Sequence, residues 1–525
     1  MPADVSRFQN RQSQDGCMVY TFHQKDIRPT DSLCFYRTLQ SLADMPEQDY
    51  IAYDFCRRNT MQDLATHHLT HFWTQTVVSA SHQEPAVLHA LLALSGAHRT
   101  YIDNINQPAI PQETAKHLTM PSYIHYGKAV HYLQNRIPGS EMRQDELEVI
   151  LIVCLLLLTF DIIEGRYNEA LVHLNHGRRI LKGLQRSIDN QSLSDQSAVT
   201  LYLPQKVQST LDDLSYSFAL MDLQSITFGS DILQFKLAET LDADNMQYPT
   251  AAQHQFSTFD DAWRSLLILE NEIFHFTTAV KQQGGLDQAT IIWQSKLLTS
   301  LRGWKSAFDN SPLRRTRVRT PPTGVAPEHD PSSTLRLNHS YLTIVVGIAL
   351  SFGDEMASDS FLPQFVTIVA LCEDLVTRLP TISLDASLIP ALYATATICR
   401  HPNVRRRALQ TLLKSGREGH WDGKQVAMIA TQKMLLEEEM AGYAYCDGRP
   451  VPETPEVVAE TIPREARWEE TWADFVDDEY TKVLLTFKRR KCDQKEVPWV
   501  GGSVNEEDKY EVRRKLVDLT QPRGP

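Results

Sequence analysis

The most ligand-like group in this sequence is the stretch DLATHHLTHFW, which contains Asp63, His67 and His71. These residues are four positions apart, so a continuous helix would place them on one face with a spacing that suits a metal ion. A metal site also needs a further ligand from elsewhere in the chain. In a chain with 18 histidines such a pair arises easily by chance. We therefore interpret the stretch as an ordinary helix surface without a metal.

A second histidine pair, His173 and His176, follows Glu169 within what reads as one helix. The same metal or catalytic chemistry could be considered there. Histidines that flank a buried helical stripe more often hydrogen-bond to neighbouring helices. We assign them that structural role.

The stretch REGHWDG, residues 417–423, concentrates glutamate, histidine, tryptophan and aspartate in one short connection, as many active-site loops do. No nucleophile or phosphate-binding loop accompanies it. We therefore expect a joint between two helices, in which Gly419 permits the turn and Asp422 caps the next helix.

Motifs of the common enzyme classes are missing from the sequence: it has no GxSxG, no GKS or GKT loop, and no GxGxxG after a strand. The eight cysteines, at positions 17, 34, 56, 154, 372, 399, 446 and 492, include no CxxC pair. This spacing excludes zinc ribbons, binuclear zinc clusters and thioredoxin-type motifs. We accordingly assign no catalytic, cofactor-binding or metal-binding residue.

The charge balance disfavours nucleic acid as a general partner, because the formal net charge is −13 and nucleic-acid recognition needs a basic surface. Two basic clusters stand out: RRTRVR at 314–319, and KRRK, which is Lys488, Arg489, Arg490 and Lys491. Either cluster could be a nuclear import signal or a phosphate contact. The alternative is a solvated loop and the charged end of a strand.

The element that must organise the fold is the apolar stretch LIVCLLLLTFDII. Its uninterrupted apolar run, Val149 to Leu158, is ten residues, whereas a bilayer-spanning helix needs about 20. Acidic residues precede it, and charged residues follow it. We expect a helix that is buried on every side. The break at EGRY and the amphipathic pattern after it predict an antiparallel helical hairpin.

Helical periodicity continues along most of the chain. We predict helices over 62–80, 85–101, 121–137, 144–163, 167–184, 205–227, 259–281, 287–309, 336–353 and 361–379, with three more up to about 442.

Near the C-terminus the pattern changes to alternation. In YTKVLLTFKRRK the residues Val483, Leu485 and Phe487 would share one face of a strand. The preceding RWEETWADF could pair with it, giving a two-stranded ribbon on the helices. The acidic and aromatic segment 453–480 also has the composition of some disordered activation segments; we favour the strand.

These patterns predict an all-α protein, a large multi-helical bundle of antiparallel helix pairs with a small C-terminal β-ribbon. We expect an irregular N-terminal segment at 1–60, a helical domain at 61–445 and a β-ribbon with a polar tail at 446–525. Within the helical domain, 311–333 combines proline, serine and arginine and should form a mobile loop. The polar N-terminus lacks the apolar core of a secretory signal, so we expect an intracellular protein without a membrane anchor.

Several stretches, in this order, resemble the fungal-specific transcription factor domain. They are EPAVLHALLALSGAH, IHYGKAVHYLQ, ELEVILIVCLLLLTFDIIEGRYNEALVHLNHGRRIL, LIPALYATATICRHPNVRRRALQTLLKSGREGHWDG and IPREARWEETW. Together they span roughly residues 60 to 490. Each alone is a helix or strand pattern, so the resemblance depends on their order.

The resemblance implies a regulatory body that masks, dimerises or relays signals to transcription. Its expected partners are other transcription proteins or a second copy of the chain, with a small-molecule effector, and its expected place is the nucleus as well as the cytoplasm. The DNA-reading zinc cluster of that family is absent from this sequence, so we expect no direct sequence-specific DNA binding. The leading hypothesis is a fungal nuclear regulatory protein that modulates transcription through protein contacts or a small-molecule effector, with a metabolite gene cluster as one candidate target. The alternatives are an enzyme or small-molecule-binding protein of secondary metabolism built on the same helical body, and a pure interaction scaffold.

Overall fold

The structure is a computed structural model of the 525-residue chain. It describes residues 6–12, 18–23, 45–65, 69–106, 112–136, 143–189, 199–204, 207–227, 233–239, 255–283, 287–315, 331–351, 354–442, 462–476, 482–490 and 510–519.

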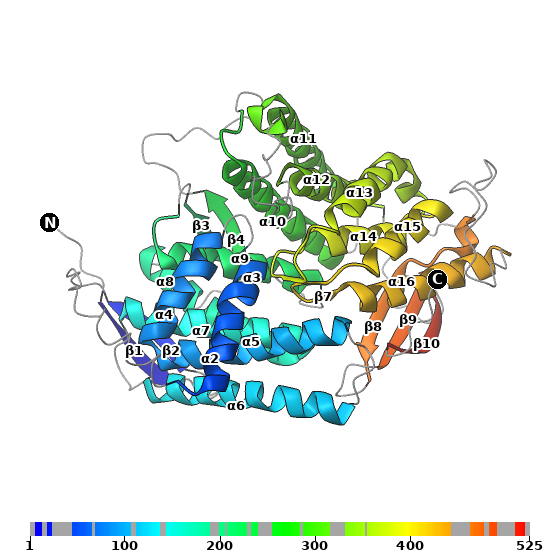
Figure 1. The fold of residues 1–525 in the computed structure, drawn as a ribbon. Helices are drawn as coiled ribbons and strands as arrows, with labels where there is room; N and C mark the ends of the chain where they lie inside the picture. The colour runs from blue at the N-terminus through cyan, green and yellow to red at the C-terminus, as the bar shows by residue number, and fades with distance from the viewer. Residues whose placement is uncertain are drawn as a thin grey trace. The chain divides into compact units, whose positions relative to one another are not determined.

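The chain divides into two compact units. Unit 1 comprises Met1–Tyr248 together with Pro380–Asp385, and unit 2 comprises Pro249–Leu379 together with Ala386–Pro525. Helices dominate the described residues of both units (Figure 1). The predicted all-α class is therefore confirmed.

Unit 1 is built around a single hairpin of long helices. Its elements are β1 (Ser6–Gln12), β2 (Met18–His23), α2 (Glu47–Phe55), η2 (Cys56–Thr60), α3 (Met61–Leu64), η3 (Phe72–Thr76), α4 (Val77–Gln83), α5 (Pro85–Asn106), α6 (Gln112–Arg136), α7 (Gln144–Ile163), α8 (Tyr167–Asp189), β3 (Val199–Leu203), α9 (Thr210–Thr227), β4 (Phe235–Glu239) and β5 (Ile382–Ser383).

Helix α7 has the bounds that the sequence predicts, and each residue from Val149 to Ile163 is buried. It packs against α5, α8 and α9, which is how a helix without a polar face is accommodated. Glu146, the third residue of the helix, caps its start, because its carboxylate accepts the backbone N–H of Arg143 at 2.9 Å. The chain then reverses at Gly165, whose φ of +74° favours glycine. The hairpin prediction is confirmed.

One close approach tightens the hairpin against α9. A Cβ added at Gly177 of α8 would lie 2.0 Å from the Phe218 ring of α9. A glycine in a helix interior costs about 1 kcal/mol relative to alanine. Here it lets a buried aromatic ring lie directly on the helix backbone.

The N-terminal segment differs from the expectation for 1–60, because β1 and β2 form an antiparallel pair and α2 begins at Glu47. The sequence does contain the start signal of α2, with Pro46 before the helix and the acidic Glu47 and Asp49 in its first turn.

Two strands in unit 1 are additions to the predicted helices. Strands β3 and β4 pair in parallel, with Val199 opposite Phe235 and Leu203 opposite Glu239. The alternation of buried Val199, Leu201 and Leu203 is the pattern of a half-buried strand. Helix α9 therefore begins at Thr210, rather than near 205.

Unit 2 combines a second helical body with the C-terminal sheet. Its elements are α10 (Phe259–Gln283), α11 (Gln288–Asn310), η4 (Pro312–Arg315), α12 (Pro331–Ile348), η5 (Ala357–Phe361), α13 (Leu362–Leu375), α14 (Leu388–Ile398), α15 (Pro402–Leu412), β6 (Arg417–Glu418), β7 (Trp421–Asp422), α16 (Gly423–Met440), η7 (Arg464–Ala466), β8 (Glu470–Phe475), β9 (Lys482–Arg490) and β10 (Tyr510–Asp518).

The predicted C-terminal ribbon is confirmed and gains a third strand. Strand β9 is central, with β8 and β10 antiparallel on either side. Val483, Leu485 and Phe487 are buried and form a core with Trp468. The segment predicted as a polar tail thus supplies β10, which adds Val517 to the same core.

The loop predicted at 311–333 is shorter than expected, because helical residues occupy both of its ends. Residues 312–315 form η4, and α12 begins at Pro331. Residues 316–330 lie outside the described part of the chain, so the expectation of a mobile loop there stays a prediction.

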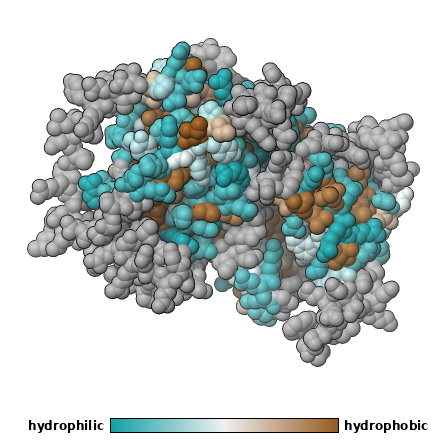
Figure 2. Space-filling view, turned by 90° about the horizontal axis from the view of Figure 1, so that it is seen from below, coloured by the Kyte–Doolittle hydropathy of each residue, from teal (hydrophilic) through white to brown (hydrophobic). Residues whose placement is uncertain are grey.

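The sequence predicts no membrane-spanning helix. Within the described ranges, no helix is long and apolar enough to cross a bilayer. Exposed apolar residues do occur, such as Met120 and Ile124 on α6. The face shown in Figure 2 carries small hydrophobic patches interrupted by hydrophilic residues. Such a mixed surface is usual for folded proteins.

Candidate functional site

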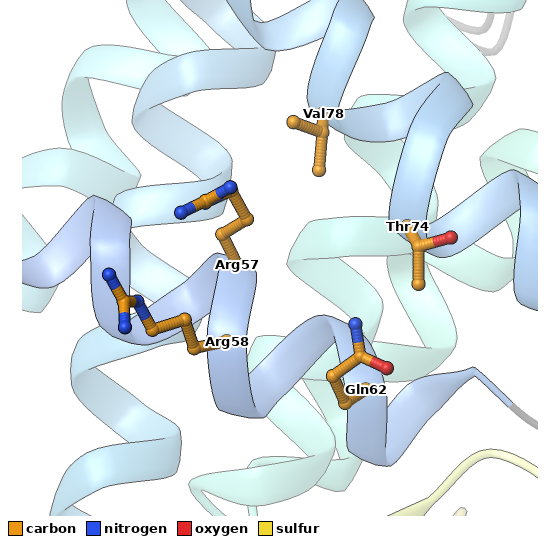
Figure 3. A pocket seen from close by; sticks show the side chains of 5 residues that line it. All are labelled: Arg57, Arg58, Gln62, Thr74 and Val78. Atoms are coloured by element: carbon orange, nitrogen blue, oxygen red, sulfur yellow. The ribbon is translucent and has the colours of Figure 1, made fainter.

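An open pocket of about 640 Å³ lies in unit 1 and is lined by Arg57, Arg58, Gln62, Thr74 and Val78. In Figure 3 the two arginines stand on one side and Thr74 and Val78 on the opposite side. The amide nitrogen of Gln62 points towards the space between them. A volume of this size is within the range of small-molecule pockets, which is about 300–1,000 Å³.

Two π-helical turns build the walls of this pocket. In η2 the Met61 N–H bonds to the Cys56 carbonyl, and in η3 the Val77 N–H bonds to the Phe72 carbonyl. Each of these bonds spans five residues instead of four. Turn η2 supplies both arginines, and η3 supplies Thr74.

The inner faces of both turns are anchored in the core. In η2 the Cys56 thiol lies 3.7 Å from the Leu91 carbonyl, and Thr60 Oγ1 lies 3.0 Å from His98 Nδ1. In η3 Phe72 and Trp73 are both fully buried. The residues on the outer faces are therefore held in place by a rigid base.

The arginines are only partly neutralised. Asp54 accepts an N–H from Arg58 Nε at 2.9 Å and one from Arg57 Nη2 at 3.4 Å. These hydrogen bonds, that from Arg58 first, lower the pKa of Asp54. Each guanidinium has five N–H donors, so most of the donors remain for water or a ligand. The local charge of these three side chains is positive.

The predicted histidine stretch does not form one helix face. Helix α3 ends at Leu64, and the next helical turn, η3, begins at Phe72. Asp63 instead lies 3.4 Å from His98 Nε2. His67 lies outside the described residues. Among the described residues, no group of three or more metal-ligating side chains is positioned to hold a metal ion.

One member of the second histidine pair, His173, takes part in a network with Tyr126 and Asp161 at the turn of the hairpin. His173 Nε2 lies 2.7 Å from the Tyr126 hydroxyl and 3.5 Å from Asp161 Oδ2. The Tyr126 hydroxyl also donates to Asp161 at 3.3 Å. Burial, with the nearby charge of His176, lowers the pKa of His173 to about 4. The assigned structural role fits these contacts.

One cation accompanies Asp161. Arg166 Nη1 lies 3.4 Å from Asp161 Oδ1, and its Nη2 lies 3.2 Å from Glu169. The same guanidinium lies over the rings of Tyr123 and Tyr126, at 5.6 and 5.8 Å. Burial of Asp161 outweighs this partner and raises its pKa to about 7.

The stretch at 417–423 is a joint between helices, as the sequence predicts. Gly419 has a φ of +51° between β6 and β7, and Asp422 Oδ1 accepts the Gln425 N–H at 3.0 Å to cap α16. Glu418 has a role that the sequence did not reveal. Its Oε2 accepts three backbone N–H groups at the start of α14, from Ser387, Leu388 and Ile389, at 2.9, 3.0 and 2.9 Å.

Unit 2 contains a second buried charge network, centred on Glu437 of α16. Arg400 Nη2 and Arg405 Nη1 each lie 2.8 Å from its carboxylate, and the Trp468 N–H donates to it at 3.0 Å. Burial would raise the pKa of Glu437, but the charges of Arg400, Arg405 and Lys433 lower it to about 2. Burial also lowers the pKa of Lys433, to about 8.

The proposed import cluster lies at the end of the central strand of the C-terminal sheet. Lys488, Arg489 and Arg490 belong to β9, whereas Lys491 lies outside the described residues. Both edges of β9 are hydrogen-bonded to neighbouring strands. The backbone of these residues is therefore committed to the sheet.

Two of these cations also have partners within the sheet. Lys488 lies 4.0 Å from the centre of the Tyr510 ring. Arg489 pairs with Glu511 at 2.5 Å and lies over the Trp468 ring at 4.9 Å. The import role of the cluster stays a prediction.

Unit 1 is thus a mainly helical body around the buried helix α7, with one wall of its open pocket basic. Residues 54–276 match the family model described as the fungal specific transcription factor domain. These residues are therefore similar to that domain, and the resemblance seen in the sequence is confirmed over them.

A curated relative points in the same direction. Over 203 residues the chain is 24% identical to the aspercryptin biosynthesis cluster-specific transcription regulator of Emericella nidulans. The matched stretch covers 39% of this chain and 30% of that protein. None of the solved structures matches the chain.

Proposed function

We propose that this protein regulates transcription, and that the helical body of residues 54–276 is its regulatory part. The observation that carries the proposal is the match of this region to the fungal specific transcription factor domain. The region includes the buried α7–α8 hairpin and the pocket residues.

The target genes that we propose are those of a fungal biosynthetic cluster. The support is the printed function of the relative from Emericella nidulans, which is a cluster-specific transcription regulator. The protein would act through other transcription proteins, a second copy of the chain or a small-molecule effector, and would act in the nucleus.

Promoter recognition by these 525 residues alone is not part of the proposal. Their net charge is −13 and they contain no closely spaced cysteine pair. A protein that neutralises phosphates without reading bases binds weakly and loses affinity as salt rises.

A second candidate function is an enzyme or small-molecule-binding protein of secondary metabolism. The open pocket favours it, because concave sites with a few polar groups are the usual location of such chemistry.

The experiment pairs expression profiling of a deletion strain with titration of the purified chain against promoter and scrambled duplexes at physiological salt. We expect altered transcript levels for a limited gene set and no sequence-selective binding. Tight, selective binding by the isolated chain would contradict the proposed indirect action. Unchanged transcripts with one accumulated precursor would favour the enzyme.

A further inference from the structure

We propose that the pocket lined by η2 and η3 binds a small organic acid that combines a carboxylate with an apolar body. The proposal rests on three features of the pocket: its basic wall, its apolar wall and the two π-helical turns that hold them.

The basic wall offers unused hydrogen-bond donors. Arg57 and Arg58 share the single carboxylate of Asp54, which takes one N–H from each in the contacts of the described residues. A planar guanidinium matches a carboxylate in two parallel hydrogen bonds. Gln62 adds an amide nitrogen directed towards the same space (Figure 3). An anionic group is the ligand that these donors suit.

The opposite wall presents mainly carbon atoms to the pocket. Val78 contributes methyl groups, and the Thr74 hydroxyl is turned away from the arginines (Figure 3). That hydroxyl already donates to the Thr70 carbonyl at 2.6 Å. Thr74 therefore adds mainly carbon surface to the pocket. A ligand that reaches from the arginines to this wall needs an apolar body.

The π-helical turns are an independent indication of function. Such turns make up well under 1% of residues in proteins and occur frequently at functional sites. Here two of them lie within residues 56–76, and both line the same pocket. Three of the five lining residues belong to them, and their inner faces are fixed in the core.

This site deepens the proposed function by naming the class of a small-molecule effector, and its biological meaning rests on that function. The binding of the ligand does not depend on the proposed function. A metabolite of this class would report the state of a biosynthetic pathway to the regulator.

The test is isothermal titration calorimetry of the full chain with octanoate as the probe. Octan-1-ol lacks the charge, octylammonium reverses it, and inorganic phosphate lacks the apolar body. We expect octanoate to bind at one equivalent and at least tenfold more tightly than the other three. Octanol or phosphate binding as tightly as octanoate would overturn the proposal, as would the absence of octanoate binding.

The matched variants are Arg57→Ala with Arg58→Ala, and Arg99→Ala as the control. All three arginines are exposed, so the variants should fold. We expect at least tenfold weaker octanoate binding for the double variant and unchanged binding for the control. Octanoate binding by the double variant within twofold of wild type would place the ligand elsewhere.

The two proposals fail in different ways. If octanoate binds as expected but deletion leaves transcripts unchanged, the regulatory function is wrong and the pocket stands. If transcripts change and octanoate does not bind, the pocket assignment is wrong and the regulatory function stands.

Discussion

Two fully buried carboxylates in this protein have pKa values that are shifted in opposite directions. Asp161, at the turn of the hairpin in unit 1, has its pKa raised to about 7. Glu437, in α16 of unit 2, has its pKa lowered to about 2. Both are 0% exposed, so burial alone does not determine the charge state.

The difference lies in the cations. Glu437 has Arg400 and Arg405 at 2.8 Å and the charge of Lys433 as well. Among the described residues, the arginine paired with Asp161 is Arg166, at 3.4 Å, and Arg166 also pairs with Glu169. Desolvation disfavours a buried charge unless nearby opposite charges compensate it. Glu437 is therefore held as an anion, whereas Asp161 is protonated and ionised in comparable amounts at pH 7.

The two networks accordingly do different things. The Glu437 network fastens α16 to Arg400, Arg405 and the backbone of Trp468 by charge. The Asp161 network makes it easier for the buried carboxyl at the hairpin turn to keep its proton, because its pKa is raised to about 7. Substitutions that add or remove a buried carboxylate should therefore change protein stability by an amount that depends on how many cations lie beside that carboxylate.

The largest effect should come from a carboxylate without any cation. Leu156→Asp would place one in the middle of α7, where the native side chain is 0% exposed. The cost of an unpaired buried charge is several kcal/mol, against a total stability of about 5 to 15 kcal/mol. We expect the variant to be insoluble or to show no cooperative melting by circular dichroism.

The control for this prediction is Val172→Asp in the same hairpin. Val172 lies on α8 and is 51% exposed, so its carboxylate would stay in water. This variant should melt like wild type. A Leu156→Asp protein that melts cooperatively near the wild-type temperature would show that α7 is not buried.

Removing the compensated charge should have the next largest effect. Glu437→Gln leaves Arg400 and Arg405 buried without their shared anion. Breaking a buried ion pair in this way costs about 3–5 kcal/mol. Glu439→Gln, on an exposed position of the same helix, is the control and should change stability by less than about 0.5 kcal/mol. Urea denaturation at pH 7 measures both; equal stabilities for the two variants would contradict the network.

Low pH should reduce the difference in stability between wild type and Glu437→Gln. The pKa of Glu437 is about 2 in the folded protein and 4.5 in its ordinary state. A lowered pKa contributes stability that is present above pH 4.5 and is lost as the pH falls towards 2. The gap between wild type and Glu437→Gln should therefore narrow between pH 5 and pH 3. A constant gap over this range would show that Glu437 is not an anion held by its partners.

The smallest effect should come from Asp161→Asn, because the neutral form of Asp161 is already well populated at pH 7. We expect a change of less than about 1 kcal/mol in the free energy of unfolding at pH 7. A loss of several kcal/mol would show that the Asp161 charge is needed, and that Arg166 compensates it fully.

The pH dependence of the stability of Asp161→Asn should show the effect of the lowered pKa of His173. In wild type, between pH 4 and 6.5, the folded state holds a proton on Asp161 and the unfolded state holds one on His173. The two contributions to the pH dependence cancel. Without Asp161, only the lowered pKa of His173 remains, so stability should rise with pH over this range. A profile parallel to wild type would contradict the shifts.

The sequence predicts those elements whose hydrophobic pattern and end signals agree. The helix at 144–163 has acidic residues at its start, a long apolar run and a glycine turn at its end, and all three are found. The helix predicted at 62–80 is wrong in detail, because α3 ends at Leu64 and η3 is a π turn. A π turn of five residues is too short for its period to be recognised in the apolar pattern.

The pocket could not be predicted in the same way. Arg57 and Arg58 fall in the segment expected to be irregular, although their spacing of three and four residues from Asp54 is a helical signal. The partners of Glu437 come from α15, from the link between α14 and α15, and from the chain after η7. Such long-range pairs depend on tertiary packing, which no local pattern specifies.

The central claim is that this helical body acts on transcription, and the most direct measurement is nascent-transcript sequencing after rapid depletion of the protein. We predict that a limited set of genes changes its synthesis rate before any metabolite level shifts. Unchanged nascent transcription, with a metabolite falling and its precursor accumulating first, would contradict the claim.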